Sequence, residues 1–126
     1  MYLLDTNVII DFCNAKLPLN AKELLQTIQP KISVITSIEL FSSPKITQPE
    51  LLKLNQFISI ATVYNSINQD IVSRTIYIRQ QFKIKLPDAL IAATALHYNL
   101  ILITRNTADF INIETLQTLN PWTISQ

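Results

Sequence analysis

The chain has no glycine among its 126 residues, and it has only one cysteine, one histidine and one tryptophan. Without glycine, neither a P-loop nor a glycine-rich dinucleotide-binding loop is present, which excludes those classes of nucleotide-binding enzyme. Turns must use Asn, Asp and Pro instead, and we expect Asn99 to adopt the left-handed conformation that ends a helix. A lone Cys13 forms no internal disulfide, and with a lone His97 it supplies neither a zinc site nor a nucleophile–base pair.

Long hydrophobic runs are also missing, because Asp5 and Asp11 interrupt the apolar N-terminal stretch. No segment approaches the roughly 20 apolar residues of a membrane span, and no basic region precedes that stretch as in a signal peptide. We therefore expect a cytoplasmic protein. Hydrophobic residues make up 48% of the chain, and this content and length predict a single globular domain over residues 1–126.

The net charge is only +1, so overall charge does not indicate a nucleic-acid-binding protein. The distribution is more informative, because four of the ten cations lie close together in the sequence: Arg74, Arg79, Lys83 and Lys85. Carried by a helix, they would form either a local basic face for a polyanion or an ordinary solvated surface. The sequence leaves both interpretations open.

Short apolar runs alternate with helical patterns along the whole chain. The runs predict strands at 2–4, 32–35, 58–63 and 100–103, with a possible edge strand at 122–124. Helices are expected at 8–13, at 20–29 with Asn20 as the cap, from 36 onward, at 48–57, 68–81 and 87–97. Because the strands are continuous apolar runs, we expect a parallel sheet covered by helices on both faces, in an α/β domain.

Four of the nine acids follow the predicted strand ends or precede a strand by one helix. Asp5 follows the first strand, Glu39 lies one helical turn past the second, and Asp109 follows the fourth. Asp88 begins the helix that leads into the fourth strand. Since functional groups gather beyond the carboxyl ends of parallel strands, we expect all four at one edge of the sheet.

Each of these acids also has a purely structural interpretation. Asp5, Asp88 and Asp109 are placed to favour helix N-termini, and Thr36 and Glu39 have the spacing of a capping box. Helix capping does not require an acid at every strand end, however, so the four together favour a functional site.

A cluster of carboxylates needs protons or a cation. Two carboxylates about 5 Å apart repel by roughly 3 kcal/mol at an effective dielectric constant near 20. Either some stay protonated or a cation lies among them. Oxygen ligands without His or Cys suit Mg²⁺ or Mn²⁺, and such ions activate water for attack on phosphodiesters. Metal-dependent phosphodiester hydrolysis is therefore the predicted chemistry.

Four segments resemble the signature blocks of PIN-domain ribonucleases, and in particular the VapC-type toxins of bacterial toxin–antitoxin pairs. They read LDTNV at 4–8, TSIEL at 36–40, PDALIAATA at 87–95 and TRNTADF at 104–110. The tail at 119–122, LNPW, is also similar to the family. Many relatives carry glycine where Ser43 and Asn99 stand here, which alters turn geometry more than chemistry.

The resemblance implies a three-layer α/β/α PIN-like fold with a central parallel sheet of four or five strands in the order 3-2-1-4-5. It implies an endoribonuclease dependent on Mg²⁺ or Mn²⁺, a homodimer, and a small antitoxin partner. By position, Asp5, Glu39 and Asp88 would bind metal and Asp109 would be a more variable fourth acid. Thr6 and Asn106 would hold ligands or water, and Arg105 would touch RNA phosphate. The basic residues between 74 and 85 are further candidates for RNA contact.

Two other functions remain open from the sequence. An acid-based phosphotransfer protein would be a receiver or an aspartyl phosphatase, yet no acid follows the third strand, and Asn7 stands where a phosphatase has its second acid. A non-catalytic PIN-like binding protein would not need all four acids.

Overall fold

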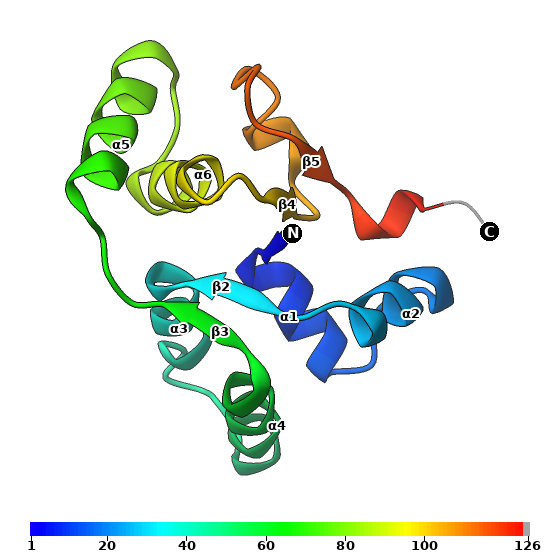
Figure 1. Cartoon of the computed structure of the whole chain (residues 1–126). Helices are drawn as coiled ribbons and strands as arrows, with labels where there is room; N and C mark the ends of the chain where they lie inside the picture. The colour runs from blue at the N-terminus through cyan, green and yellow to red at the C-terminus, as the bar shows by residue number, and fades with distance from the viewer. Residues whose placement is uncertain (125–126) are drawn as a thin grey trace.

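The structure is a computed structural model that describes residues 1–124. Short strands alternate with helices along the chain (Figure 1). The strands are β1 (Tyr2–Leu4), β2 (Lys31–Ser33), β3 (Thr62–Tyr64), β4 (Ile101–Ile103) and β5 (Thr118–Leu119). The α-helices are α1 (Thr6–Cys13), α2 (Leu19–Thr27), α3 (Val34–Phe41), α4 (Gln48–Ile60), α5 (Gln69–Gln81) and α6 (Leu86–His97). Two 3-10 helices follow β4 and β5 and are η1 (Thr107–Asp109) and η2 (Pro121–Thr123).

All the strand pairs are parallel, as predicted. In the register, Leu4 of β1 lies opposite Ile103 of β4, and Ile103 also lies opposite Leu119 of β5. β2 pairs with β3, and β1 contacts β2. The pairs β2-β3, β1-β4 and β4-β5 are neighbours in the expected order 3-2-1-4-5. Hydrogen bonding, however, defines a three-stranded sheet, β1-β4-β5, and a separate two-stranded sheet, β2-β3, rather than one continuous sheet.

The central strands bury residues on both faces, which explains their continuous apolar sequences. Leu3 and Leu102 pack into a core formed with α5 and α6. Their neighbours Leu4 and Ile103 point the other way, into a core formed with α1, α2, α3 and α4, because side chains alternate along a strand. Figure 1 shows α5 and α6 together on one side of the strands and α1, α2 and α4 on the other. The expected three layers are therefore present.

Polar side chains fix where several helices begin. Asp5 caps α1, and Asn68 caps α5 by accepting from the backbone N–H of Ile71 at 2.9 Å. α4 begins with a capping box formed by Thr47 and Glu50. These contacts satisfy backbone N–H groups that lack a partner in the first helical turn.

Four predictions of element position differ from the structure. The sequence predicts the third strand at 58–63, but α4 continues to Ile60, where the Ala61 N–H donates to the Ile58 carbonyl oxygen, and β3 is Thr62–Tyr64. The second strand ends at Ser33 rather than residue 35, because the Ser33 hydroxyl accepts from the N–H groups of Ile35 and Thr36 and starts α3. Asn20 is not a cap, since α2 begins one residue earlier after Pro18. The predicted edge strand at 122–124 is wrong: η2 lies there, and the edge strand is β5.

The lack of glycine is visible at two turns. Asn99, after α6, has φ of 56°, as expected for a left-handed position, and Ala15, after α1, has φ of 55°. Asn tolerates this conformation better than Ala, whose Cβ makes it unfavourable by about 1–2 kcal/mol. Ala15 is therefore a strained position.

Within the described residues, no helix is long and apolar enough to cross a membrane.

Candidate functional site

The four predicted acids all lie at the carboxyl ends of the parallel strands. Asp5 directly follows β1, and Glu39 lies in α3, the helix that β2 leads into. Asp88 lies in the first turn of α6, and Asp109 is the last residue of η1 after β4. Four separate segments thus bring acids to one edge, here called the carboxylate rim (Asp5, Glu39, Asp88 and Asp109).

The pKa of Asp88 responds to its burial and to the three other rim acids. It is raised from 3.8 to about 6, first because the carboxyl group is half-buried, and then because the charges of the three other rim acids, Asp5, Asp109 and Glu39, repel its negative form. The Lys85 ammonium opposes this effect and lowers the pKa. The charges of the three other rim acids therefore act on Asp88, and a cation beside it would offset their repulsion.

Asp5 is the most firmly held acid of the rim. Its side chain is 5% exposed. Its Oδ1 accepts from the backbone N–H of Thr6 at 2.8 Å, and its Oδ2 accepts from Thr104 Oγ1 at 2.7 Å and Asn7 Nδ2 at 3.4 Å. A buried carboxylate with three donors keeps one orientation. Asp5 is thus both the cap of α1 and a fixed part of the rim.

Glu39 is exposed, and one hydrogen bond joins it to the segment that carries Asp5. Thr6 Oγ1 donates to Glu39 Oε1 at 2.6 Å. The capping-box interpretation of Glu39 is wrong, because α3 begins at Val34 and is capped by Ser33. Thr36 is fully buried inside the helix, and among residues 1–124 its hydroxyl has no hydrogen-bond partner. Glu39 is therefore free of a capping role.

Asp109 is also exposed, and the local capping explanation does not account for it. Asn106 precedes η1 but makes no side-chain cap hydrogen bond. Its backbone N–H instead donates to Thr104 Oγ1 at 3.1 Å, and its carbonyl oxygen accepts from the Asp109 N–H at 3.0 Å. These bonds shape the loop that presents Asp109, and they leave the Asp109 carboxylate available.

Two residues of the site received no role in the sequence analysis. Thr104 is fully buried, and its hydroxyl links Asp5 to the loop after β4. The Asn7 side chain bridges the same parts, since it donates to Asp5 and accepts from the Arg105 N–H at 3.2 Å. The one signal for Thr104 is a hydroxyl directly after an apolar strand. No local pattern reveals a partner 99 residues away.

The donor set fits a hard divalent cation, because all the rim ligands are carboxylate oxygens. No three acidic, histidine or cysteine side chains in the described part of the chain are yet close enough together to hold an ion. The Asp88 carboxyl nevertheless responds to the charges of the three other rim acids, and a cation among them would offset that repulsion.

The basic residues do not form one helical face. Arg74 and Arg79 lie on α5, whereas Lys83 and Lys85 lie in the connection between α5 and α6. Arg74 Nε pairs with Asp70 Oδ2 at 2.7 Å, and this pairing and the contact with His97 lower the pKa of Asp70. Arg79 Nη1 donates to the carbonyl oxygen of Ile84 at 2.8 Å. Lys85, at the start of α6, is the member that acts on the rim.

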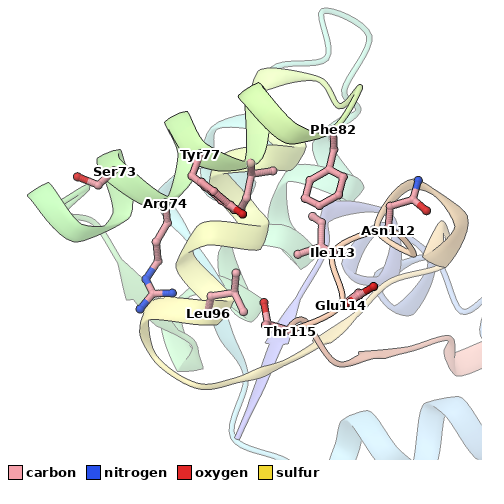
Figure 2. A pocket seen from close by; sticks show the side chains of 10 residues that line it. Ser73, Arg74, Tyr77, Phe82, Leu96, Asn112, Ile113, Glu114 and Thr115 are labelled. Carbon is pink, nitrogen blue, oxygen red and sulfur yellow. The ribbon is translucent and has the colours of Figure 1, made fainter.

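A hollow of about 520 Å³ lies away from the rim, between α5, α6 and the segment 112–115 (Figure 2). Tyr77, Phe82 and Ile113 are among its lining residues, together with Arg74. None of the rim acids lines it, so this cavity is not the site of the predicted chemistry.

The family of the chain agrees with this site. The model of the PIN domain matches residues 2–116, and the chain belongs to the PIN domain family. The predicted resemblance and the PIN-like α/β fold class are therefore confirmed. The receiver and aspartyl phosphatase alternatives lose their basis, because the fold and the acid positions are those of another family.

Solved structures of similar fold are toxin–antitoxin proteins. A toxin–antitoxin complex from Klebsiella pneumoniae contains a chain 38% identical to this one, with 98% of this chain and 100% of that one covered and a TM-score of 0.79. DNA-bound VapBC from Salmonella typhimurium gives 25% identity, 95% and 97% coverage and a TM-score of 0.82. VapBC-1 from nontypeable Haemophilus influenzae gives 27% identity, 98% coverage of both chains and a TM-score of 0.77. A search of curated proteins found no match. The chain is thus a VapC-type PIN domain, and the predicted class of function, a nuclease toxin, is confirmed at the family level.

Proposed function

We propose that the protein is a metal-dependent endoribonuclease, the toxin of a toxin–antitoxin pair, whose active site is the carboxylate rim. The observation that carries this proposal is that four acids from separate segments lie at the carboxyl edge of the parallel strands. Burial and the charges of the three other acids raise the pKa of Asp88, which supports it. Such an arrangement destabilises the fold unless a cation binds, and a binding role explains why it exists.

Asp5, Glu39 and Asp88 would hold the ion, with Asp109 as a more weakly bound or water-mediated ligand. Mg²⁺ or Mn²⁺ would supply an activated water nucleophile and stabilise negative charge on phosphate oxygens. Side chains around the ligands fix their orientation, and this contributes to affinity and activity in metal sites. Thr6 would do so for Glu39, and Asn106 would do so by shaping the loop before Asp109.

Cations near the rim would bind the RNA. Lys85 stands three residues before Asp88 and already acts electrostatically on it. Lys83 lies in the same connection, and both lysines are exposed. Arg74 and Arg79 are weaker candidates, since each is engaged by another group of the chain. We expect phosphate contacts first from Lys85 and Lys83.

An antitoxin would cover the surface beside Glu39 and so block access to the carboxylate rim. A hollow of about 250 Å³ there is lined by Glu39 and by apolar residues that include Ile10, Leu40 and Leu54. Exposed Ile10 and Ile38 extend this apolar surface, and such surface is typical of a partner site. The toxin–antitoxin complexes among the similar structures support this partner.

Three further features belong to the proposal. A homodimer is supported by exposed Ile76 and Tyr77 on α5, which are large apolar residues on one helix. We expect the protein to act in the cytoplasm, where its RNA substrates are. Residues 1–126 are expected to form one domain.

The decisive test is cleavage of single-stranded RNA by the purified chain with and without Mg²⁺ or Mn²⁺. Asp5→Asn should lower the rate roughly a thousandfold or more and leave the far-UV circular dichroism spectrum unchanged. Glu23→Gln, which removes an exposed acid of α2, should cleave at the wild-type rate. Activity that persists in a chelator, or a fully active Asp5→Asn protein, would overturn the proposal.

A non-catalytic PIN-like binding protein is the alternative. It would bind RNA or the antitoxin without cleaving RNA, and calorimetry would detect no binding of Mn²⁺ to the wild-type chain.

A further inference from the structure

Arg105 forms a flat cationic surface beside the carboxylate rim. Its guanidinium carbon lies 4.7 Å from the centroid of the Trp122 ring, and its Nη1 lies 3.5 Å from Asp11 Oδ2. The Arg105 side chain remains 57% exposed, whereas that of Asp11 is 16% exposed. The indole ring therefore covers one part of the guanidinium, the largely buried Asp11 carboxylate contacts its edge, and the rest faces solvent.

Both ends of the chain hold Arg105 in this place. Its backbone N–H donates to Asn7 Oδ1 at 3.2 Å, and its carbonyl oxygen accepts from Asn120 Nδ2 at 3.4 Å. Asn120 Oδ1 accepts from the Trp122 N–H at 2.9 Å and so caps η2. Asn120 therefore binds both the Arg105 backbone and the segment that carries Trp122. These bonds fix the backbone of Arg105, and Trp122 and Asp11 hold its side chain. The guanidinium therefore presents its planar face with little loss of conformational entropy on binding.

The surface is connected to the rim by adjacent residues. Thr104, next to Arg105 in the chain, donates to Asp5 Oδ2. Asp11, which tethers the guanidinium, follows Asp5 by six residues on α1, which is about 9 Å along a helix axis. A nucleotide next to the one at the rim would therefore reach Arg105.

The chemistry of this arrangement favours a base over a phosphate. Asp11 already offsets part of the charge of Arg105, which weakens its attraction for a phosphate. Its planar face is unaffected, and unpaired bases stack on guanidinium planes and aromatic rings. We propose that Arg105 on Trp122 is a stacking platform for one unpaired nucleobase of the RNA that flanks the cleaved phosphate.

This inference rests on the proposed function for its substrate, single-stranded RNA, but it assigns Arg105 a different role from the phosphate contact that the resemblance implies. It adds a base-recognition site formed by the Thr104–Asn106 loop and the C-terminal residues Asn120 and Trp122.

Trp122 is the only tryptophan, so its fluorescence reports directly on the platform. The probes are a hexanucleotide of adenosine and an abasic hexamer with the same ribose–phosphate chain, each titrated into the wild-type protein in a chelator. We expect the adenosine hexamer to quench the fluorescence saturably and the abasic hexamer to bind about tenfold more weakly. Gel analysis of the hexamer after the titration checks that it stays intact.

Arg105→Lys keeps the positive charge but replaces the planar guanidinium, on which a base could stack, with an ammonium group. It should weaken the adenosine hexamer five- to tenfold and leave the affinity for the abasic hexamer unchanged. Lys22→Arg, a charge-keeping change at an exposed residue of α2, is the control and should change neither affinity. Trp122→Leu, measured by anisotropy of a labelled hexamer, should weaken the adenosine hexamer in the same way, and melting temperatures of all variants verify folding.

Equal binding of both hexamers to the wild type, equal weakening of both by Arg105→Lys, or no binding of either would overturn the platform. The cleavage assay with Asp5→Asn is independent of this result. A protein that shows base-dependent quenching but never cuts RNA would retain the platform and contradict the proposed function.

Discussion

The two halves of the carboxylate rim are held in opposite ways. Asp5 and Glu39, from the N-terminal part of the chain, accept four hydrogen bonds between them from Thr6, Asn7 and Thr104. Asp88 and Asp109, from the C-terminal part, accept none within residues 1–124, and Asp88 is the acid whose pKa is raised. The fold orients Asp5 and Glu39 through hydrogen bonds, whereas among residues 1–124 no side chain orients Asp88 and Asp109 in this way.

This difference suggests a division of roles. Asp5 and Glu39, the oriented half, would fix the position of the bound cation. Asp88 and Asp109, the repelled half, would supply negative charge that attracts the cation and that the cation neutralises. The following experiments test this division.

The largest effect is expected from neutralising the repelled half. Asp88→Asn should reduce RNA cleavage by roughly a thousandfold, because the change removes a charged ligand. The same change relieves repulsion, so the metal-free variant should be more stable than the wild type at neutral pH. Cleavage rates and urea unfolding measure the two effects. An inactive variant that is also destabilised would contradict the account, because Asp88 would then be a structural acid.

The oriented half is tested by Thr104→Val, which removes the hydroxyl that donates to Asp5 and keeps the side-chain shape. Cleavage should fall about 10–100-fold, as for other residues that orient metal ligands. Thr94→Val is the matched control, because it removes another buried hydroxyl, one that donates to the Leu90 carbonyl oxygen in α6. Both variants should lose about 1 kcal/mol of stability, and only Thr104→Val should lose activity. Equal activities in the two variants would remove Thr104 from the site.

A smaller loss is expected from Asp109→Asn. Its carboxylate is exposed and lies on a short 3-10 helix, so we expect about a tenfold reduction in cleavage and a weaker apparent affinity for Mn²⁺. Titration of the cleavage rate with Mn²⁺ separates the two effects. A loss as large as that of Asp88→Asn would make Asp109 a direct and essential ligand.

The raised pKa of Asp88 predicts a pH dependence of stability without metal. This carboxyl group titrates near 3.8 in the unfolded chain and near 6 in the folded one, so between these values the folded state binds more protons. Its contribution to stability is full below pH 3.8 and is lost as the pH rises through about 6. With solvent screening of a half-buried group, we expect a loss of about 1–2 kcal/mol between pH 4 and 7.5.

Comparing the wild type with Asp88→Asn and Ala15→Gly separates the contribution of Asp88 ionisation to stability from effects that do not depend on pH. In urea unfolding with a chelator, Asp88→Asn should be more stable than the wild type at pH 7.5 and equal to it near pH 4. Ala15→Gly, which relieves the positive φ of Ala15, should stabilise by about 1 kcal/mol at both pH values. An Asp88→Asn gain that does not change with pH would mean that ionisation of Asp88 is not its origin.

Much of the fold could be predicted from the sequence, because local signals and global packing agree. The continuous apolar strands of the β1-β4 pair bury Leu3 and Leu4 on opposite faces, and Asn99 takes the left-handed position expected of it. The positions of Asp5, Glu39 and Asp109 followed from the predicted strand ends, and that of Asp88 followed from the start of the helix before the fourth strand.

The errors have identifiable physical causes. The second strand was predicted too long, because Val34 and Ile35 favour strands, yet the Ser33 hydroxyl caps a helix at that point. The edge strand was misplaced because its position depends on pairing with β4, which local sequence does not encode. Residues 118–119 pair with β4, and the Thr104 N–H donates to the Leu119 carbonyl oxygen at 3.0 Å. The roles of Thr104 and Asn7 depend on contacts between the two ends of the chain, which no local spacing encodes.

We propose that the carboxylate rim binds a divalent cation through both of its halves. Titration of Mn²⁺ into the purified wild-type chain by calorimetry at pH 7.5 tests it most directly, with Asp5→Asn, Asp88→Asn and Glu23→Gln alongside. We predict saturable binding to the wild type and to Glu23→Gln, and at least a tenfold loss of affinity in each rim variant. Absence of Mn²⁺ binding to the wild type, or undiminished binding to both rim variants, would contradict the account.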